Sequence, residues 1–184
     1  MFSNFYGIYK NARNASWRFL IDYSVSQLPV DLHPIIKKNG IKIKFGDEKV
    51  LKPQQRGLTT TDGAETYIVL REESSIVERR YTIAHELGHG FLGHLLVDGR
   101  YAQTAENEYE AERFAIDILA PACVLWGLNL HTAREISEAC GISMTAAKKR
   151  AERMRILYQR NKFLASPLEQ RVYRQFLDFI SKNK

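Results

Sequence analysis

The segment Tyr81–His89 constrains this chain most, because it sets a His-Glu-x-x-His pattern inside a stretch with helical character. Residues four apart lie on one face of a helix, so His85 and His89 can bind a single metal ion while Glu86 projects beside them. The pattern therefore predicts half of a metal-dependent hydrolase site.

Two histidines on an apolar helix can also be hydrogen-bonded core residues, so the local context decides between the readings. Ser75 and Glu78 form a capping-box pattern that starts a helix just upstream. Ile83 and Leu87 give that helix an apolar stripe. Gly88 is costly inside a helix and indicates close approach by another group. This context favours the metal site.

The residue types suit zinc, although another divalent metal such as Mn²⁺ is an alternative. Neutral imidazole is a good zinc ligand, and a catalytic zinc ion has three protein ligands and an open fourth position for water. A carboxylate beside that water can take its proton during attack on a carbonyl group. We therefore expect His85 and His89 to be ligands and Glu86 to be the general base.

The third ligand has to come from elsewhere in the chain. His94, five residues after His89, lies off the ligand face of the helix and is a poor candidate. The segment 106–117 has a helical pattern rich in acidic residues, and four of its residues share one face. These four are Glu106, Glu110, Phe114 and Asp117. From this face we expect Glu110 to be the third ligand.

Three stretches of the chain resemble the ImmA/IrrE metallopeptidases. They are Arg79–His89, Glu110–Ala115 (EAERFA) and Ile118–Pro121 (ILAP), and the similarity is specific from Ile68 to Pro121. The resemblance implies a zincin-like α+β fold with one zinc ion, as in gluzincins.

The same resemblance assigns roles to individual residues. It implies that His85, His89 and Glu110 bind the metal and that Glu86 is the catalytic carboxylate. The chain departs from the family at Glu112, where relatives often have Asn, and in the short connection from Leu95 to Thr104.

The resemblance also implies a function. It predicts a zinc-dependent endopeptidase that makes limited cuts in one protein partner, a helix-turn-helix transcriptional repressor encoded on a phage or mobile element. One alternative is a regulatory DNA- or protein-binding module whose metal site is structural or vestigial. Another is a toxin-like component of a two-gene module.

The remaining patterns predict an α+β layout in two parts. Residues 1–130 are expected to form the zincin-like domain, with N-terminal helices, a small twisted sheet and two metal-binding helices. Alternating or β-branched residues predict strands at Ile41–Phe45 and Thr66–Leu70, whereas Thr59–Asp62 is interpreted as a turn. If Thr66–Leu70 lies at a sheet edge beside the metal, it can pair with an extended substrate peptide.

Residues 131–184 are expected to form a helical, basic C-terminal region. Residues 133–154 have the pattern of a helix, a short turn containing Gly141 and a second helix, which is typical of a helix-turn-helix. From Ser143 to Lys184 there are 11 Lys or Arg against 3 Asp or Glu, a net charge of +8, and the rest of the chain carries −2. This asymmetry is compatible with DNA contact, with binding to a partner protein, or with a solvated face on helices that pack on the core.

Composition points to a cytoplasmic protein. The chain is 45% hydrophobic over 184 residues, enough for one good core, and it has no apolar run long enough to cross a bilayer. We expect no signal peptide, because the first residues lack a positively charged stretch followed by an apolar core. Cys123 and Cys140 are interpreted as buried thiols in a reducing compartment.

Overall fold

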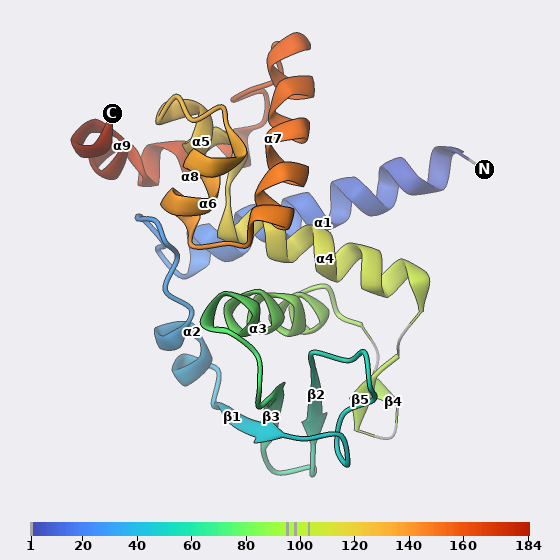
Figure 1. Cartoon of the computed structure of the whole chain (residues 1–184). Helices are drawn as coiled ribbons and strands as arrows, with labels where there is room; N and C mark the ends of the chain where they lie inside the picture. Colours follow the sequence, from blue (N-terminus) through green and yellow to red (C-terminus); the bar gives the residue numbers. More distant parts are fainter. Residues whose placement is uncertain (1, 95, 98, 103) are drawn as a thin grey trace. The chain divides into compact units, whose positions relative to one another are not determined.

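The computed structural model describes residues 2–94, 96–97, 99–102 and 104–184, and it has the expected α+β composition (Figure 1). In chain order the elements are α1 (Phe2–Asp22), α2 (His33–Lys38), β1 (Ile41–Gly46), β2 (Gly57–Thr61), β3 (Thr66–Arg71), α3 (Ile76–Phe91), β4 (Leu96–Val97), β5 (Arg100–Tyr101), α4 (Ala105–Leu119), α5 (Ala122–Gly127), α6 (Ala133–Cys140), α7 (Met144–Gln159), α8 (Pro167–Gln175) and α9 (Leu177–Asn183).

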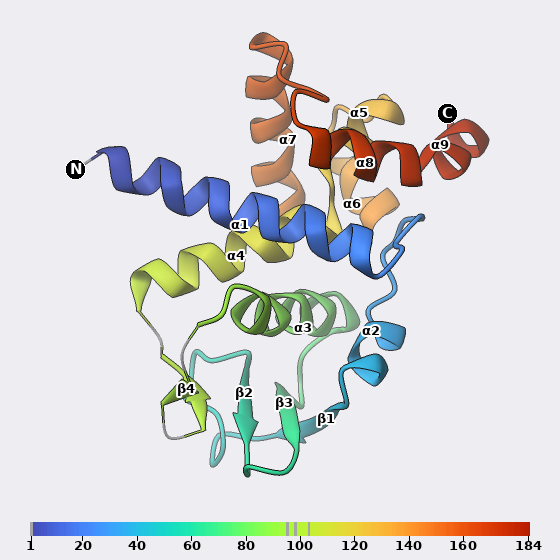
Figure 2. The same ribbon diagram turned by 180° about the vertical axis from the view of Figure 1, so that it is seen from behind.

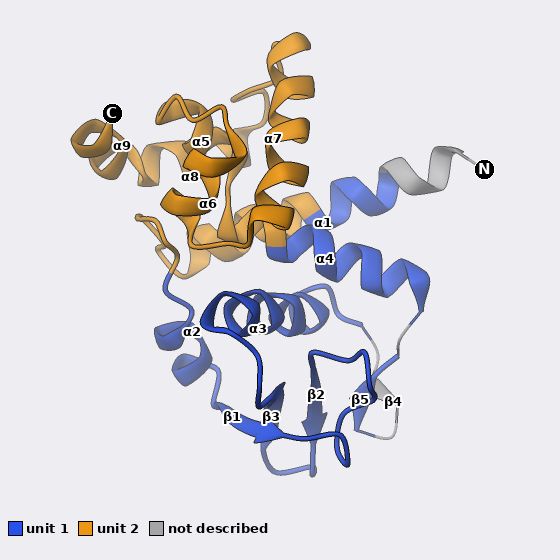
Figure 3. Cartoon of the chain, viewed as in Figure 1, with its two compact units in different colours: residues 1–12, 31–115 blue, residues 13–30, 116–184 orange. Residues whose placement is uncertain are grey.

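The chain divides into two compact units (Figure 3). The first contains residues 1–12 and 31–115, and the second contains residues 13–30 and 116–184. The sequence placed a boundary at residue 130 instead. The difference arises because residues 13–30 and 116–130 pack with the C-terminal helices.

A mixed sheet is the base of the first unit. Its described strands follow the order β1-β3-β2-β5-β4, with β1 and β3 parallel and the other neighbours antiparallel. Strand β3 is therefore an interior strand, paired with β1 on one side and β2 on the other, and its residues Ile68–Arg71 are all buried. The possibility that Thr66–Leu70 forms the edge beside the metal is thus corrected.

Strand β2 occupies a segment that the sequence suggested would end in a turn. It pairs with β3 along its whole length, whereas β5 pairs with it only at Thr60 among the described residues. The Gly57–Leu58 part of β2 therefore has a side edge that no described strand covers. Of the connection that follows α3, residues 95, 98 and 103 lie outside the described part of the chain.

Helix α3 lies between the sheet and α4, as the two opposite views in Figures 1 and 2 show. Its start is the expected capping box, in which the Ser75 hydroxyl accepts from Glu78 N and the Glu78 carboxylate accepts from Ser75 N. Gly88 explains the close approach of α4. A Cβ atom at this position would lie 3.0 Å from Phe114 Cδ1 and 3.3 Å from the Ala111 backbone.

The second unit is helical and has a core of its own. Gln175 of α8 donates to the carbonyl oxygens of Leu20 and Val25, which ties the end of α1 to the C-terminal helices. The guanidinium of Arg150 is buried, pairs with Asp117 at 2.8 Å and donates to Ala120 O. These contacts place residues 13–30 and 116–120 with the C-terminal region.

Helices α6 and α7 have the shape that the sequence predicted. A capping box of Thr132 and Glu135 starts α6, and Gly141 ends it with φ of 60°, a left-handed conformation that suits glycine. The Ser143 side chain then caps α7. Cys123 and Cys140 are free, buried thiols.

Candidate metal centre

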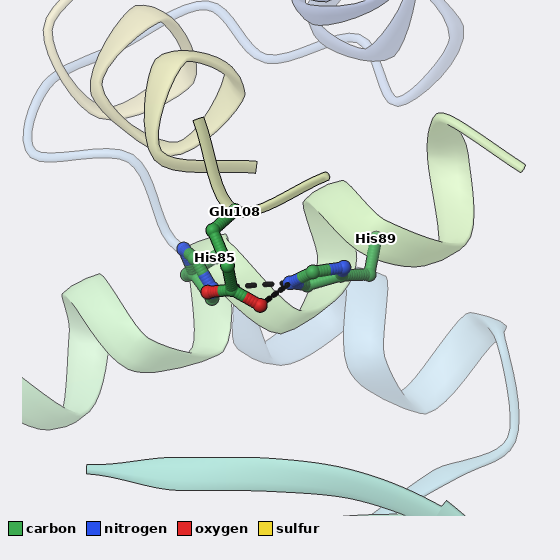
Figure 4. A group of neighbouring side chains, drawn as sticks. All are labelled: His85, His89 and Glu108. Atoms are coloured by element: carbon green, nitrogen blue, oxygen red, sulfur yellow. Dashed lines mark hydrogen bonds and ion pairs between the residues drawn. The ribbon is translucent and has the colours of Figure 1, made fainter. Parts of the chain in front are cut away.

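His85 and His89 lie one turn apart on α3 and direct their Nε2 atoms toward each other, 3.1 Å apart (Figure 4). The four-residue spacing puts both rings on the same face of the helix. His89 is buried and its ring stacks on that of Tyr101, with ring centroids 5.2 Å apart. The helix thus supplies two converging nitrogen ligands.

A carboxylate from α4 completes the group. Glu108 Oε2 lies 3.2 Å from His85 Nε2, and Glu108 Oε1 lies 3.6 Å from His89 Nε2 (Figure 4). In a tetrahedral zinc site with bonds of about 2.0–2.2 Å, neighbouring ligand atoms lie about 3.3–3.5 Å apart. The three side chains therefore fit one divalent ion, and they are the group of potential metal ligands found among the described residues.

The sequence predicted Glu110 as the third ligand, but the structure does not bring Glu110 into this group. Glu110 turns away from the paired Nε2 atoms and contacts His94 and Asn11. Residues two apart on a helix differ by about 200° in direction, so Glu108 and Glu110 cannot serve the same face. Glu110, Phe114 and Asp117 are buried, whereas Glu108 lies on the face toward the two histidines.

A sequence signal for Glu108 exists in retrospect. Gly88 requires a small partner where the two helices meet, and Ala111 is that partner. Glu108 precedes Ala111 by three residues and Glu112 follows it directly, so both lie on the side of α4 near this crossing. Both residues line the cleft beside the histidines.

Glu86 is held next to this group by β2. Its Oε2 atom accepts a hydrogen bond of 2.7 Å from the Thr59 hydroxyl. Burial raises the pKa of Glu86, and the bond from Thr59 partly offsets that rise. The carboxyl group is thus fixed in orientation and shifted toward the range in which it can both take and return a proton.

The electrostatics of two of the candidate ligands, His89 and Glu108, favour metal binding. Burial, aided by the neighbouring His85, lowers the pKa of His89 to about 4, so its ring is neutral at pH 7. The hydrogen bond with His85 holds the pKa of Glu108 below its usual range, which keeps it ionised. Neutral imidazole and ionised carboxylate are the forms that bind a metal.

A cleft of about 590 Å³ opens over the group. Its walls come from the loop at residues 52–56, the start of β2, one face of α3, Arg100 and Tyr101, and two carboxylates of α4. Arg71 of β3 holds the loop in place by donating to the carbonyl oxygens of Lys52 at 2.6 Å and Gln55 at 3.0 Å. The size is within the range of small-ligand and peptide side-chain pockets.

Four side chains close in sequence to the candidate ligands, those of Tyr67, Tyr81, His94 and Tyr101, could donate to an oxyanion, and the structure separates them. Tyr81 and Tyr101 line the cleft. Tyr67 hydrogen-bonds Glu65, and His94 contacts the side of His89 that faces away from the metal group. The cleft therefore leaves Tyr81 and Tyr101 as the candidates.

These contacts on an α+β scaffold are those of a metallopeptidase-type protein. The chain belongs to the Peptidase_M78 family, whose IrrE N-terminal-like domain matches residues 37–152, well over half of its length. This match confirms the family that the sequence suggested and supports a metallopeptidase-type function. A search among curated proteins finds no match to the chain. None of the described helices is both long and apolar enough to cross a membrane.

Proposed function

We propose that this chain is a zinc-dependent endopeptidase that makes limited cuts in a specific protein, a helix-turn-helix transcriptional repressor. The observation that carries the enzymatic part is the convergence of His85, His89 and Glu108 in one cleft beside the buried Glu86. The repressor as substrate follows from the resemblance to the ImmA/IrrE metallopeptidases.

Zinc is the metal that this set of donors suits best. Two imidazole nitrogens and one carboxylate oxygen are a common catalytic zinc set, whereas Mg²⁺ and Ca²⁺ prefer oxygen ligands. When bound, zinc supplies Lewis acidity and lowers the pKa of water to about 7. His85, His89 and Glu108 would hold the ion.

Glu86 would act as the general base and then as the acid. Its carboxylate takes a proton from the attacking water and delivers it to the leaving amine, and the Thr59 hydroxyl keeps the carboxylate turned toward the cleft. Tyr81 or Tyr101 would donate a hydrogen bond to the oxyanion that develops on the substrate carbonyl.

The open edge of β2 is where an extended peptide would bind. Arg56 O accepts from Arg71 N on the β3 side, and Thr61 N donates to Gly99 O on the β5 side. Because backbone groups alternate along a strand, those of Gly57 also point toward the β5 side. A substrate strand paired there would lie along the cleft and present a peptide carbonyl to the metal group.

The first prediction tests the catalytic carboxylate. With zinc-loaded protein and a purified repressor, Glu86→Gln should lower kcat about 10²–10⁴-fold while bound zinc stays at the parent level, because the base is lost and the ligands remain. The measurements are fragment formation on gels and zinc content of the protein. Glu106→Gln, an exposed change at the start of α4, is the matched control and should leave both unchanged. Cleavage by Glu86→Gln at the parent rate would refute the mechanism.

The substrate class has its own test. Incubation with the repressor encoded beside the gene should give two discrete fragments, whose termini mass spectrometry identifies. Degradation of many unfolded proteins to small peptides, with the repressor left intact, would contradict the proposal of a specific substrate.

A second candidate function rests on the α6–α7 pair. Its helix-turn-helix shape and the exposed Lys148, Lys149 and Arg155 of α7 would suit contact with DNA. Such binding would weaken steeply with salt, because neutralised phosphates release counterions. Anisotropy measurements that find no binding to duplex DNA at low salt, together with measurable proteolysis, would rule this role out.

A further inference from the structure

The nitrogen of His89 that faces away from the metal group, Nδ1, also makes a hydrogen bond. A histidine that binds a metal through Nε2 has Nδ1 on the opposite side of the ring, and here Nδ1 lies 2.8 Å from His94 Nδ1. Two ring nitrogens at this distance share one hydrogen, so one of them donates and the other accepts. The identity of the donor determines which nitrogen of His89 has a free lone pair.

Glu110 favours one direction for the bond between His94 and His89. Glu110 Oε2 lies 3.1 Å from His94 Nε2, and Glu110 Oε1 accepts a 2.9 Å hydrogen bond from the Asn11 amide. A carboxylate only accepts, so His94 Nε2 donates to Glu110, and in the form of the ring with a single hydrogen His94 Nδ1 is left as the acceptor. His89 Nδ1 must then donate, which leaves the lone pair on His89 Nε2.

This chain of bonds is shielded from solvent. The side chains of His89, His94 and Glu110 are 3%, 5% and 11% exposed. Water therefore has little access to replace a lost partner, and a missing bond would leave a buried polar atom unsatisfied. Protein groups, and not water, therefore determine which nitrogen donates in each of these hydrogen bonds.

The geometry points to His94 and Glu110 as positioning residues that hold His89 in the one tautomer able to bind the metal. This inference rests on the proposed metal site and adds to it a second set of residues, Glu110, His94 and Asn11, that act through His89. Partners of this kind fix the ring orientation of a metal-binding histidine and raise the basicity of its ligand nitrogen.

Zinc affinity of the metal-free protein, measured by competition with a chelator, tests the inference without relying on catalysis. Glu110→Gln and His94→Phe should each weaken zinc binding about 10- to 100-fold while one zinc ion per chain still binds at saturation. His94→Asn should recover part of the loss, because its amide oxygen can accept from His89 Nδ1. The double variant His94→Phe/Glu110→Gln should be no weaker than the worse single variant, because both residues act along one path.

The control is Glu108→Gln, which removes a ligand instead of a positioning residue. It should weaken binding more than any of these variants and change the absorption spectrum of the Co²⁺-substituted protein, whereas Glu110→Gln should keep a three-ligand spectrum. Unchanged zinc affinity in both Glu110→Gln and His94→Phe would overturn the inference and leave the proposed enzyme intact. Loss of a ligand in the Co²⁺ spectrum of Glu110→Gln, with Glu108→Gln unaffected, would overturn it by making Glu110 a ligand. Failure of the parent protein to bind zinc would overturn both proposals.

Discussion

Thr59 joins two parts of the chain that are 27 positions apart, because its hydroxyl donates to the carboxylate of Glu86. Gly57 and Thr59 share the β2 face toward α3, and a side chain at Gly57 would collide with Thr82, 2.5 Å away. The strand can therefore lie close to the helix and bring the hydroxyl within bonding range of the carboxylate.

Replacing Thr59 tests this contact. Thr59→Val keeps the shape of the side chain and removes the donor, so kcat of repressor cleavage should fall about 10- to 100-fold, the equivalent of one hydrogen bond to a charged group. Thr59→Ser retains the hydroxyl and should stay close to the parent. Steady-state kinetics should show the loss in kcat with KM little changed. Equal activity of the Val and Ser variants would contradict a role for the bond.

At this scale, local spacing was informative and distant contacts were not. His85, Glu86 and His89 could be recognised because their relation depends only on the helical period. Glu108 was missed because the choice between Glu108 and Glu110 depends on how α4 is rotated against α3. Thr59 was missed for the same kind of reason, since its partner belongs to another element.

Helices α3 and α4 meet at Gly88, and this meeting brings Glu108 to the two histidines. The glycine lies against Phe114 and the backbone of Ala111. The three carbon atoms of a valine side chain at position 88 would push the two helices apart. Gly7 in α1 offers a contrast, because no atom lies within 4 Å of the Cβ position there.

Gly88→Val should therefore lower the free energy of unfolding by about 1–3 kcal/mol, the usual cost of overpacking. It should also weaken zinc binding, because Glu108 moves with α4. The matched Gly7→Val should leave stability unchanged or slightly raised, since valine is the better helix former. Chemical denaturation and chelator competition measure the two effects. A Gly88→Val protein with parent stability and zinc affinity would show that close packing is not required.

The helices were easier to predict than the strands. The capping boxes at Ser75 and Thr132 and the left-handed Gly141 are local signals, and the helices they delimit lie where the patterns indicated. Strand β2, with the sequence GLTTT, has little apolar alternation, and its last three residues fall in the segment Thr59–Asp62 that was interpreted as a turn or loop end. Its pairing with β3 stabilises it, and such pairing is not visible in a short window of sequence.

At the scale of the whole chain, the two compact units do not follow a single cut in the sequence. Residues 13–30 belong with the C-terminal helices, and the anchor is a pair of hydrogen bonds from Gln175. The sequence predicted the α+β class and a helical C-terminal part. It could not show that α1 and α4 each contribute to both units.

Arg150 shows that the basic character of the C-terminal part is not all on its surface. Its guanidinium is buried against Asp117 and Ala120 O. Arg150→Met should lower the free energy of unfolding by about 3–5 kcal/mol, because Asp117 then loses its buried cation. Adding Asp117→Leu should restore much of the loss. Thermal and denaturant unfolding test this, and a double variant no more stable than the single one would argue against a charge effect.

The hydrogen bonds from Arg71 to the loop at residues 52–56 have a consequence for how this cleft can vary between related chains. Arg71 holds the wall of the cleft through the main-chain oxygens of Lys52 and Gln55. A main-chain oxygen is present whatever the side chain at that position. Substitution of the neighbouring Gln54 would leave both hydrogen bonds in place and change the side chain that lines the cleft. Under the proposed function, substitutions in this one short segment would change the sequence preference and leave the fold around the candidate metal ligands in place.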